Sequence, residues 1–162
     1  MYVTKNPNKK HSIYNQLRYW YHISTTLGDK HITLIPWDED SSSNRGGLEP
    51  LGKRICVAPT IEQCITAIPY YLGSVCNIYR TKSKIKADAP NNVFDSKITH
   101  EGWLYDPTSF IKIGVLKFRD VEKELGISDV IDEAASLSDI KESKKVLQWW
   151  QQANIKKLIK KS

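Results

Sequence analysis

RICVAPTIEQCITAIPYYLGSVCNIY, residues 54–79, carries the clearest secondary-structure signals in the chain. The four residues that follow Arg54, ICVA, form a short apolar run rich in β-branched side chains, which predicts a buried strand. Pro59 ends this strand, because proline has no backbone N–H to donate to a neighbouring strand.

A helix is predicted directly after this strand, over residues 60–71. Thr60 suits the N-cap, since its hydroxyl can accept a hydrogen bond from the backbone N–H of Gln63. Apolar side chains then recur at helical spacing and define one face: Ile61, Cys64, Ile65 and Ile68. Gly73 separates the helix from a second predicted strand over residues 75–79. Together these elements predict a strand–helix–strand unit at the core of the fold.

The composition is that of a globular protein. The chain has 162 residues, of which 40% are hydrophobic and 10% aromatic, enough for one domain with its own core. It contains no apolar run of about 18 residues, and residues 1–12 lack the apolar region of a secretory signal, so we expect a cytoplasmic protein without a membrane partner. Three cysteines lie within apolar runs and are expected to be reduced core residues, with no metal site: Cys56, Cys64 and Cys76.

Period-two patterns predict the remaining strands. They cover residues 18–24, 31–36, 92–94, 98–105 and 110–118, and a polar loop is expected over residues 38–47. Because strands precede most of the helical sequence, we predict a single α+β domain. Its sheet is expected to be split and mixed or mainly antiparallel.

The C-terminal third is predicted to be helical. A short helix over residues 120–125 ends at Gly126, residues 128–135 add another turn or two, and a long helix runs from residue 138 towards residue 160. The adjacent Trp149 and Trp150 are expected to pack on the sheet of the chain itself. The predicted organisation is therefore a flexible N-terminal arm (1–12), an α+β core (13–118) and a C-terminal helical extension (119–162).

The formal net charge of +6 comes largely from three lysine-rich clusters, one at each end and one over residues 80–86. The terminal clusters are typical of residues that keep a small protein soluble. The cluster at 80–86 and the aromatic run at 19–21 leave open a basic binding module for nucleic acid or a protein partner. A second alternative is an inhibitor that inserts the helix carrying Trp149 and Trp150 into a partner's groove. Oligomeric state is not indicated.

Four polar residues could bind a polar ligand: His22 and Ser24 near the end of the first predicted strand, Thr60 at the start of the predicted helix, and Glu101 within the predicted strand over residues 98–105. Taken singly, each has an ordinary structural explanation, such as a surface histidine, a helix cap or a solvated glutamate. Their order resembles that of the ADP-ribosyltransferase superfamily, in its small His-type branch and degenerate relatives. The resemblance covers about residues 17–118 and rests on three segments: YHIS (21–24), VAPT (57–60) before the helix, and EGWLYDP (101–107).

The resemblance implies that NAD is the substrate and that a macromolecule, protein or nucleic acid, accepts ADP-ribose. It implies that His22 holds the nicotinamide ribose and that Ser24 contacts the carboxamide region. Glu101 would hydrogen-bond the ribose 2′-hydroxyl and stabilise the positive charge that develops as nicotinamide leaves. Thr60 and Tyr79 complete the candidate nucleotide-binding residues.

Two features differ from the pattern of the superfamily. Thr99 stands where the arginine-modifying branch has a second acidic residue, so arginine modification is not implied. The aromatic residue that stacks on nicotinamide is not evident after residues 58–60, and the substitutes are Tyr70, Tyr71 and Tyr79. A protein that binds a nucleotide without cleaving NAD therefore remains an alternative.

Overall fold

Two antiparallel sheets form the strand layer of the computed structural model, which describes residues 13–26, 28–38, 52–67, 74–90, 96–138 and 142–161. The four-stranded sheet has the order β1-β5-β7-β2, with bounds Tyr21–Ser24, Val75–Thr81, Thr108–Lys117 and His31–Leu34. The three-stranded sheet has the order β3-β4-β6, with bounds Trp37–Asp38, Lys53–Val57 and Gly102–Leu104. The predicted α+β class and split antiparallel sheet are confirmed.

The two sheets meet where β1 lies beside the end of β4. Tyr21 donates its backbone N–H to the carbonyl of Ala58 at 2.8 Å, and the N–H of Ala58 donates to the carbonyl of Tyr21 at 3.0 Å. We call this junction the seam. The strand–helix–strand unit spans it, because β4 belongs to one sheet and β5 to the other.

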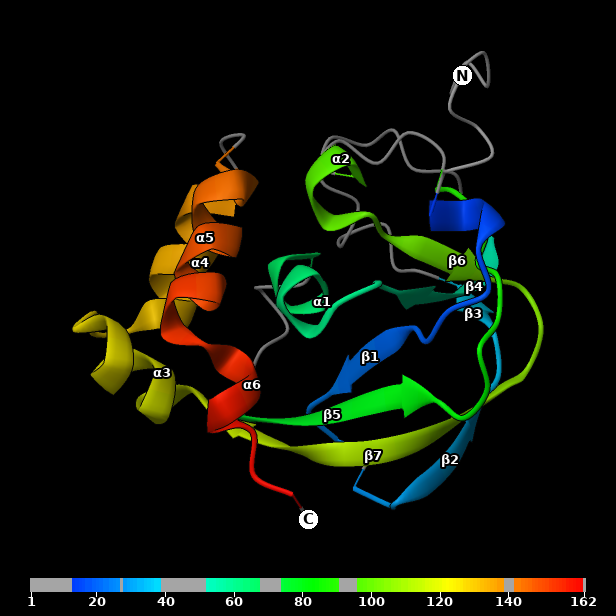
Figure 1. Cartoon of the computed structure of the whole chain (residues 1–162), viewed down its shortest axis with the longest axis horizontal. Helices are drawn as coiled ribbons and strands as arrows, with labels where there is room; N and C mark the ends of the chain where they lie inside the picture. The colour runs from blue at the N-terminus through cyan, green and yellow to red at the C-terminus, as the bar shows by residue number, and fades with distance from the viewer. Residues whose placement is uncertain are drawn as a thin grey trace.

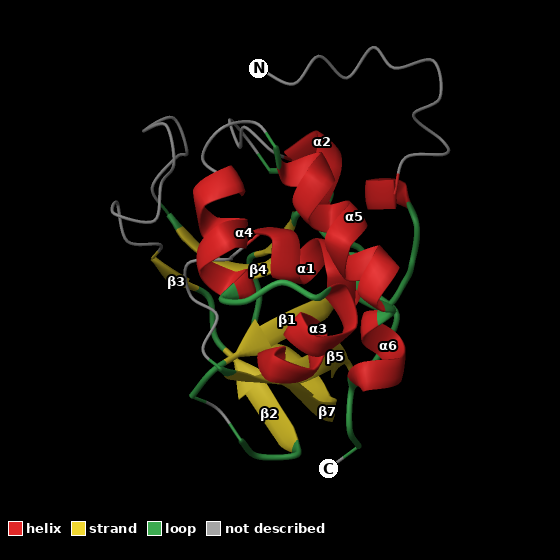
Figure 2. Cartoon of the chain, turned by 90° about the vertical axis from the view of Figure 1, so that its left-hand side faces the viewer, coloured by secondary structure: helices red, strands yellow, loops and turns green. Residues whose placement is uncertain are grey.

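Helices gather on one side of the strands. Figure 1 shows α3 to α6 together at the left, with α1 between them and the seam, and Figure 2 shows this helical layer in front of the strands. After the short 3-10 helix η2 (Ile13–Asn15), the helices are α1 (Ile61–Ala67), α2 (Ser96–Thr99), α3 (Phe118–Leu125), α4 (Val130–Ser138), α5 (Ser143–Ala153) and α6 (Ile155–Leu158). Within the described residues, none of them has the length and apolar character that crossing a membrane requires.

The hydrophobic interior has two parts. Along β1 and β5, successive side chains point alternately into one part and the other. Ile23 and Ile78 pack with the helices in what we call the helix-side core. Trp20 and Tyr79 pack in the strand-side core, together with Ile55, Val57, Ala87, Leu104 and Phe110. This alternation follows from the period-two geometry of strands, and it places the helices on one face of β1 and β5.

Two predicted helix ends are confirmed. Thr60 caps α1, since the backbone N–H of Gln63 donates to its hydroxyl oxygen at 3.1 Å. Gly126 ends α3 in the left-handed conformation, with φ 66°, and its N–H donates to the carbonyl of Glu122 at 2.8 Å. The predicted continuation of α1 over residues 68–71, the strand at 92–94, most of the polar loop at 38–47 and the arm at 1–12 lie outside the described residues.

Other predictions were wrong in part. The strand expected over residues 98–105 is confined to β6, because α2 occupies residues 96–99 and His100 adopts a positive φ of 50° that interrupts the extended chain. The long C-terminal helix is divided at Asn154, whose left-handed φ of 56° ends α5 and precedes α6. The buried residues of α5 are Ser143, Val146, Trp150 and Ala153.

Candidate functional site

His22 lies on β1 at the seam and contacts both sheets. Its Nδ1 lies 3.0 Å from the backbone carbonyl oxygen of Cys56 on β4. The imidazole ring centroid lies 5.8 Å from that of Phe110 on β7 and 5.9 Å from that of Trp37 on β3. Four strands therefore meet around one partly buried imidazole.

These contacts determine the protonation of His22. A carbonyl oxygen only accepts hydrogen bonds, so Nδ1 carries the hydrogen and Nε2 keeps its lone pair in the neutral ring. Burial lowers the pKa of the imidazole below its ordinary value, and the hydrogen bond to the Cys56 carbonyl opposes this shift only in part. At neutral pH the ring is therefore an acceptor at Nε2, the chemistry that suits a ligand hydroxyl.

This lowered pKa predicts a contribution of His22 to the pH dependence of stability. Below about pH 6.5 this histidine is protonated in the unfolded chain, whereas in the folded protein it stays neutral to a lower pH. Acidification therefore favours the unfolded state, and the free energy of unfolding decreases as the pH is lowered. We expect the stability advantage of wild type over His22→Gln to shrink between about pH 7 and pH 5, as measured by urea denaturation. His100, whose pKa is also lowered, is present in both proteins, so it does not contribute to the difference. An advantage that stays constant over this range would contradict the prediction.

Trp37 is a site residue that the sequence analysis missed. It lies in the two-residue strand β3, pairs with Arg54 on β4, and is 38% exposed, with its ring edge-on to His22. A half-exposed indole beside a hydrogen-bond acceptor suits stacking of a flat heterocycle. Its signal in the sequence was an aromatic residue directly before a polar loop. Of the expected substitutes, Tyr70 and Tyr71 lie outside the described residues.

Ser24 lies on β1 together with His22, and Tyr79 lies on the neighbouring strand β5. Tyr79 pairs with His22 across β1 and β5, but its ring is fully buried and its hydroxyl donates to the backbone carbonyl of Asp29 at 2.6 Å. Ser24 shares the His22 face of β1, and its hydroxyl oxygen accepts the backbone N–H of Thr26 at 3.2 Å. Tyr79 thus supports the strand-side core, and Ser24 stabilises a local turn near His22.

Glu101 precedes β6 and is only 9% exposed. Its carboxylate Oε2 accepts a hydrogen bond from the indole N–H of Trp103 at 3.2 Å. Its backbone carbonyl accepts the hydroxyl of Tyr14 at 2.8 Å, and its backbone N–H donates to the hydroxyl of Thr99 at 3.3 Å. These contacts hold Glu101 as a buried structural carboxylate.

His22 and Glu101 lie on opposite faces of the strand layer. Leu104 of β6 points into the strand-side core, so Trp103 beside it points to the opposite face, and the Glu101 carboxylate bonded to the Trp103 indole lies on that face too. Burial raises the pKa of Cys64 on α1 well above its usual range, with the negative charge of Glu101 as the second cause, which places the carboxylate near α1. Thr60, the cap of α1, lies on this helix side. His22 faces the other way.

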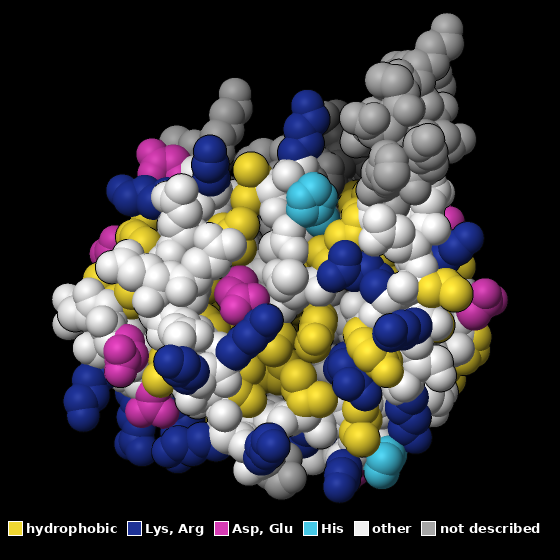
Figure 3. Space-filling view, viewed as in Figure 1, with side chains coloured by type: hydrophobic (Ala, Val, Ile, Leu, Met, Phe, Trp, Pro, Cys, Tyr) yellow, Lys and Arg dark blue, Asp and Glu magenta, His cyan; other side chains and the backbone are white. Residues whose placement is uncertain are grey.

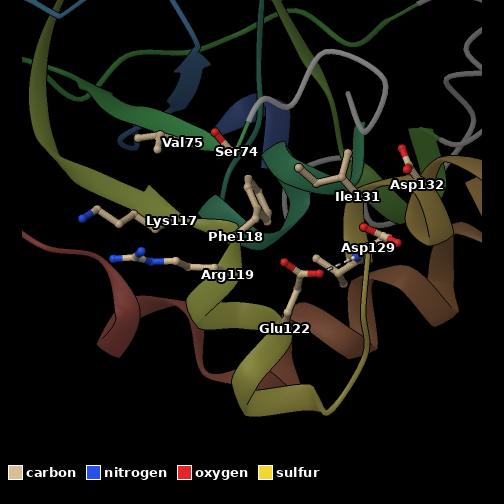
Figure 4. A pocket seen from close by; sticks show the side chains of 10 residues that line it. Ser74, Val75, Lys117, Phe118, Arg119, Glu122, Asp129, Ile131 and Asp132 are labelled. Carbon is tan, nitrogen blue, oxygen red and sulfur yellow. Dashed lines mark hydrogen bonds between the residues drawn. The ribbon is translucent and has the colours of Figure 1, made fainter.

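A separate hollow of about 580 Å³ opens between the start of α4 and the β7–α3 junction. In Figure 4, Lys117 and Arg119 extend to one side and Asp129 and Asp132 lie on the other. The Glu122 carboxylate between them accepts the backbone N–H of Val130 at 3.4 Å and so supports the first turn of α4. The positive and negative side chains of this hollow lie on opposite sides and do not converge on one point, so it is not our candidate site.

The described residues contain no cluster of three or more His, Cys, Asp or Glu side chains suited to holding a metal ion. The cysteines are free thiols. Cys64 and Cys76 are buried and Cys56 is partly buried, as predicted for core residues, and burial raises the pKa of Cys76 to about 12. Neither Cys64 nor Cys76 is therefore a thiolate nucleophile at neutral pH.

No protein-family model, curated protein or solved structure matches this chain. The candidate site therefore rests on the geometry around His22.

Proposed function

We propose that this is an ADP-ribosyltransferase-like protein that binds NAD or a related nucleotide at His22 without cleaving it. The observation that carries the proposal is the placement of three segments far apart in the sequence. YHIS, VAPT and the segment that begins with Glu101 lie on or at the ends of the neighbouring strands β1, β4 and β6. The resemblance requires these three segments to be neighbours, and in this chain the YHIS segment is the one whose side chain, His22, forms the proposed site.

The groups around His22 suit the parts of a nucleotide. The neutral Nε2 offers an acceptor for a ribose hydroxyl, and Trp37 offers a half-exposed ring for a base or nicotinamide. Phe110 closes the buried side of the imidazole and fixes its orientation. Binding at this position uses residues of both sheets, which explains why the seam suits a ligand.

The position of Glu101 favours binding without turnover. Stabilising the positive charge at the ribose requires a carboxylate close to that ribose, aimed at where the charge develops. Here the carboxylate is buried against Trp103, on the opposite face from His22. We therefore propose that Glu101 supports β6 and that nicotinamide is not released.

Calorimetric titration with NAD, with nicotinamide release followed in parallel, tests the proposal. We expect wild type to bind NAD without release, and His22→Phe to weaken binding about tenfold, because this variant cannot accept the ribose hydroxyl. Trp37→Ala should weaken binding by a similar factor, because it removes the stacking ring. Glu101→Gln should leave the Kd unchanged, since the amide oxygen still accepts the indole N–H.

His31→Gln serves as the matched control, because His31 is exposed on β2, at the other edge of the four-stranded sheet from β1. Nicotinamide release that Glu101→Gln abolishes would show a catalytic transferase and overturn binding without turnover. No binding at millimolar NAD, or equal losses of affinity in His22→Phe and His31→Gln, would overturn the nucleotide site itself.

A further inference from the structure

The end of β5 and the segment that follows it carry four cations at alternate positions and lie against the aromatic run of residues 19–21. Arg80 places its guanidinium carbon 4.0 Å from the ring centroid of Tyr19, and the ammonium nitrogen of Lys84 lies 5.6 Å from the same ring. Arg18 and Ile85 exchange backbone hydrogen bonds of 3.1 and 2.9 Å. The lysine-rich cluster and the aromatic run are therefore packed together. We call the cations of the cluster the basic surface: Arg80, Lys82, Lys84 and Lys86.

This surface is exposed and keeps a net positive charge, although Asp88 and Asp106 lie nearby. Lys82, Lys84 and Lys86 are exposed, and within the described residues none of them forms an ion pair with a carboxylate. Figure 3 shows Lys and Arg side chains gathered on the right-hand side of the molecule, where Figure 1 draws the chain that leaves β5. Such a concentration of like charge attracts a polyanion.

A hollow of about 480 Å³ lies beside the basic surface. Lys82 and Lys86 line it, together with Tyr105, whose side chain is 54% exposed. Asp88 and Asp106 line it as well. The hollow thus combines phosphate-binding cations, an exposed aromatic ring and two acceptors in one place.

We propose that the basic surface and this hollow bind single-stranded nucleic acid. The lysines contact phosphates, Tyr105 stacks on a base, and the two carboxylates accept hydrogen bonds from exocyclic amino groups of bases. An acidic protein segment fits less well, because its carboxylate side chains offer neither a flat ring to stack on Tyr105 nor an amino group to donate to Asp88 and Asp106. A duplex fits less well, because its bases are paired and stacked and do not reach Tyr105. The proposal goes beyond the nucleotide site at His22 and does not depend on it.

Fluorescence anisotropy with a labelled single-stranded DNA of about 12 nucleotides tests the proposal over a range of salt concentrations. We expect wild type to bind the single strand about tenfold more tightly than the matching duplex. The salt slope is the steepness with which the logarithm of the binding constant falls with the logarithm of the salt concentration. The triple variant Lys82→Ala/Lys84→Ala/Lys86→Ala should reduce this slope by about 2, because each lysine that neutralises a phosphate of a single strand contributes about 0.7. Tyr105→Ala should weaken binding about tenfold with an unchanged slope, and Tyr105→Phe should restore it.

The matched control is Lys123→Ala/Lys156→Ala/Lys157→Ala, which removes the same charge from exposed positions on α3 and α6. This control should keep the wild-type slope and affinity within about twofold, because these lysines lie on other elements. Equal effects of the two triple variants, equal binding of duplex and single strand, or no binding at about 50 mM salt would each overturn the proposal. Circular dichroism checks that each variant is folded.

Discussion

Trp150→Ala is expected to destabilise the protein by about 3–5 kcal/mol, the range for deleting a fully buried large aromatic side chain. Trp150 is 0% exposed in the helix-side core, and its ring packs edge-on against Phe118 with centroids 6.0 Å apart. Because a domain of this kind is stable by about 5–15 kcal/mol, the variant should lose a large part of its stability. Urea denaturation followed by far-UV circular dichroism measures the loss without relying on tryptophan fluorescence.

Trp149→Ala is the matched control, because it deletes the same side chain one residue away. Trp149 is only partly buried against the same core, so we expect a loss of about 1–2 kcal/mol. Equal losses of stability in the two variants would contradict the placement of α5. Trp150→Phe should cost less than Trp150→Ala, because it keeps an aromatic ring and removes an indole N–H that has no acceptor among the described residues.

Trp20→Ala is expected to cost a similar amount, about 3–5 kcal/mol, in the strand-side core. Trp20 is 0% exposed, its ring lies against Gly102, and its indole N–H donates to the carbonyl of Ile85 at 3.0 Å. The substitution therefore opens a cavity and also removes one of the two donors to this partly buried carbonyl, which still accepts the backbone N–H of Arg18 at 3.1 Å. Urea denaturation gives the loss of stability.

Trp20→Phe separates these two effects. It keeps most of the apolar packing and removes the hydrogen bond to Ile85, so we expect a loss of about 1–2 kcal/mol. A loss as large as that of Trp20→Ala would mean that the hydrogen bond, rather than packing, provides the stabilisation. Negligible losses in both variants would contradict the burial of Trp20. Because Ile85 lies within the basic surface segment, Trp20 also connects that segment to the core.

The elements predicted correctly are those whose signals are local. The capping hydroxyl of Thr60, the apolar run of β4 and the left-handed glycine at position 126 each act within a few residues. The failures follow the same principle. α2 and the turn at His100 replace part of a predicted strand, because this short segment makes its contacts with α1 and α5, which lie far away in the sequence. The left-handed conformation of Asn154 likewise has no strong local signal.

The candidate site was predictable only in part. His22 was identified from the sequence, and its strand lies beside β4. Trp37 was missed, because its proximity to His22 depends on the pairing of β3 with β4, and nothing near position 37 reveals that pairing. Glu101 was identified as a candidate for catalysis, and its hydrogen bond to Trp103 and its proximity to Cys64 of α1 place it on the helix side.

The sequence by itself determined the α+β class, the main strands, the capped helix α1 and the separate basic and aromatic segments. Periodicity and capping depend on residues close together in the chain, so a single sequence reveals them. Only the tertiary structure decided which face of the strand layer each polar side chain occupies, and which distant segments meet. A shift of one residue in strand pairing moves a side chain to the opposite face, and that register is decided by packing across the whole molecule. His22 and Glu101 are therefore separated, whereas Tyr19 and Arg80 are brought together.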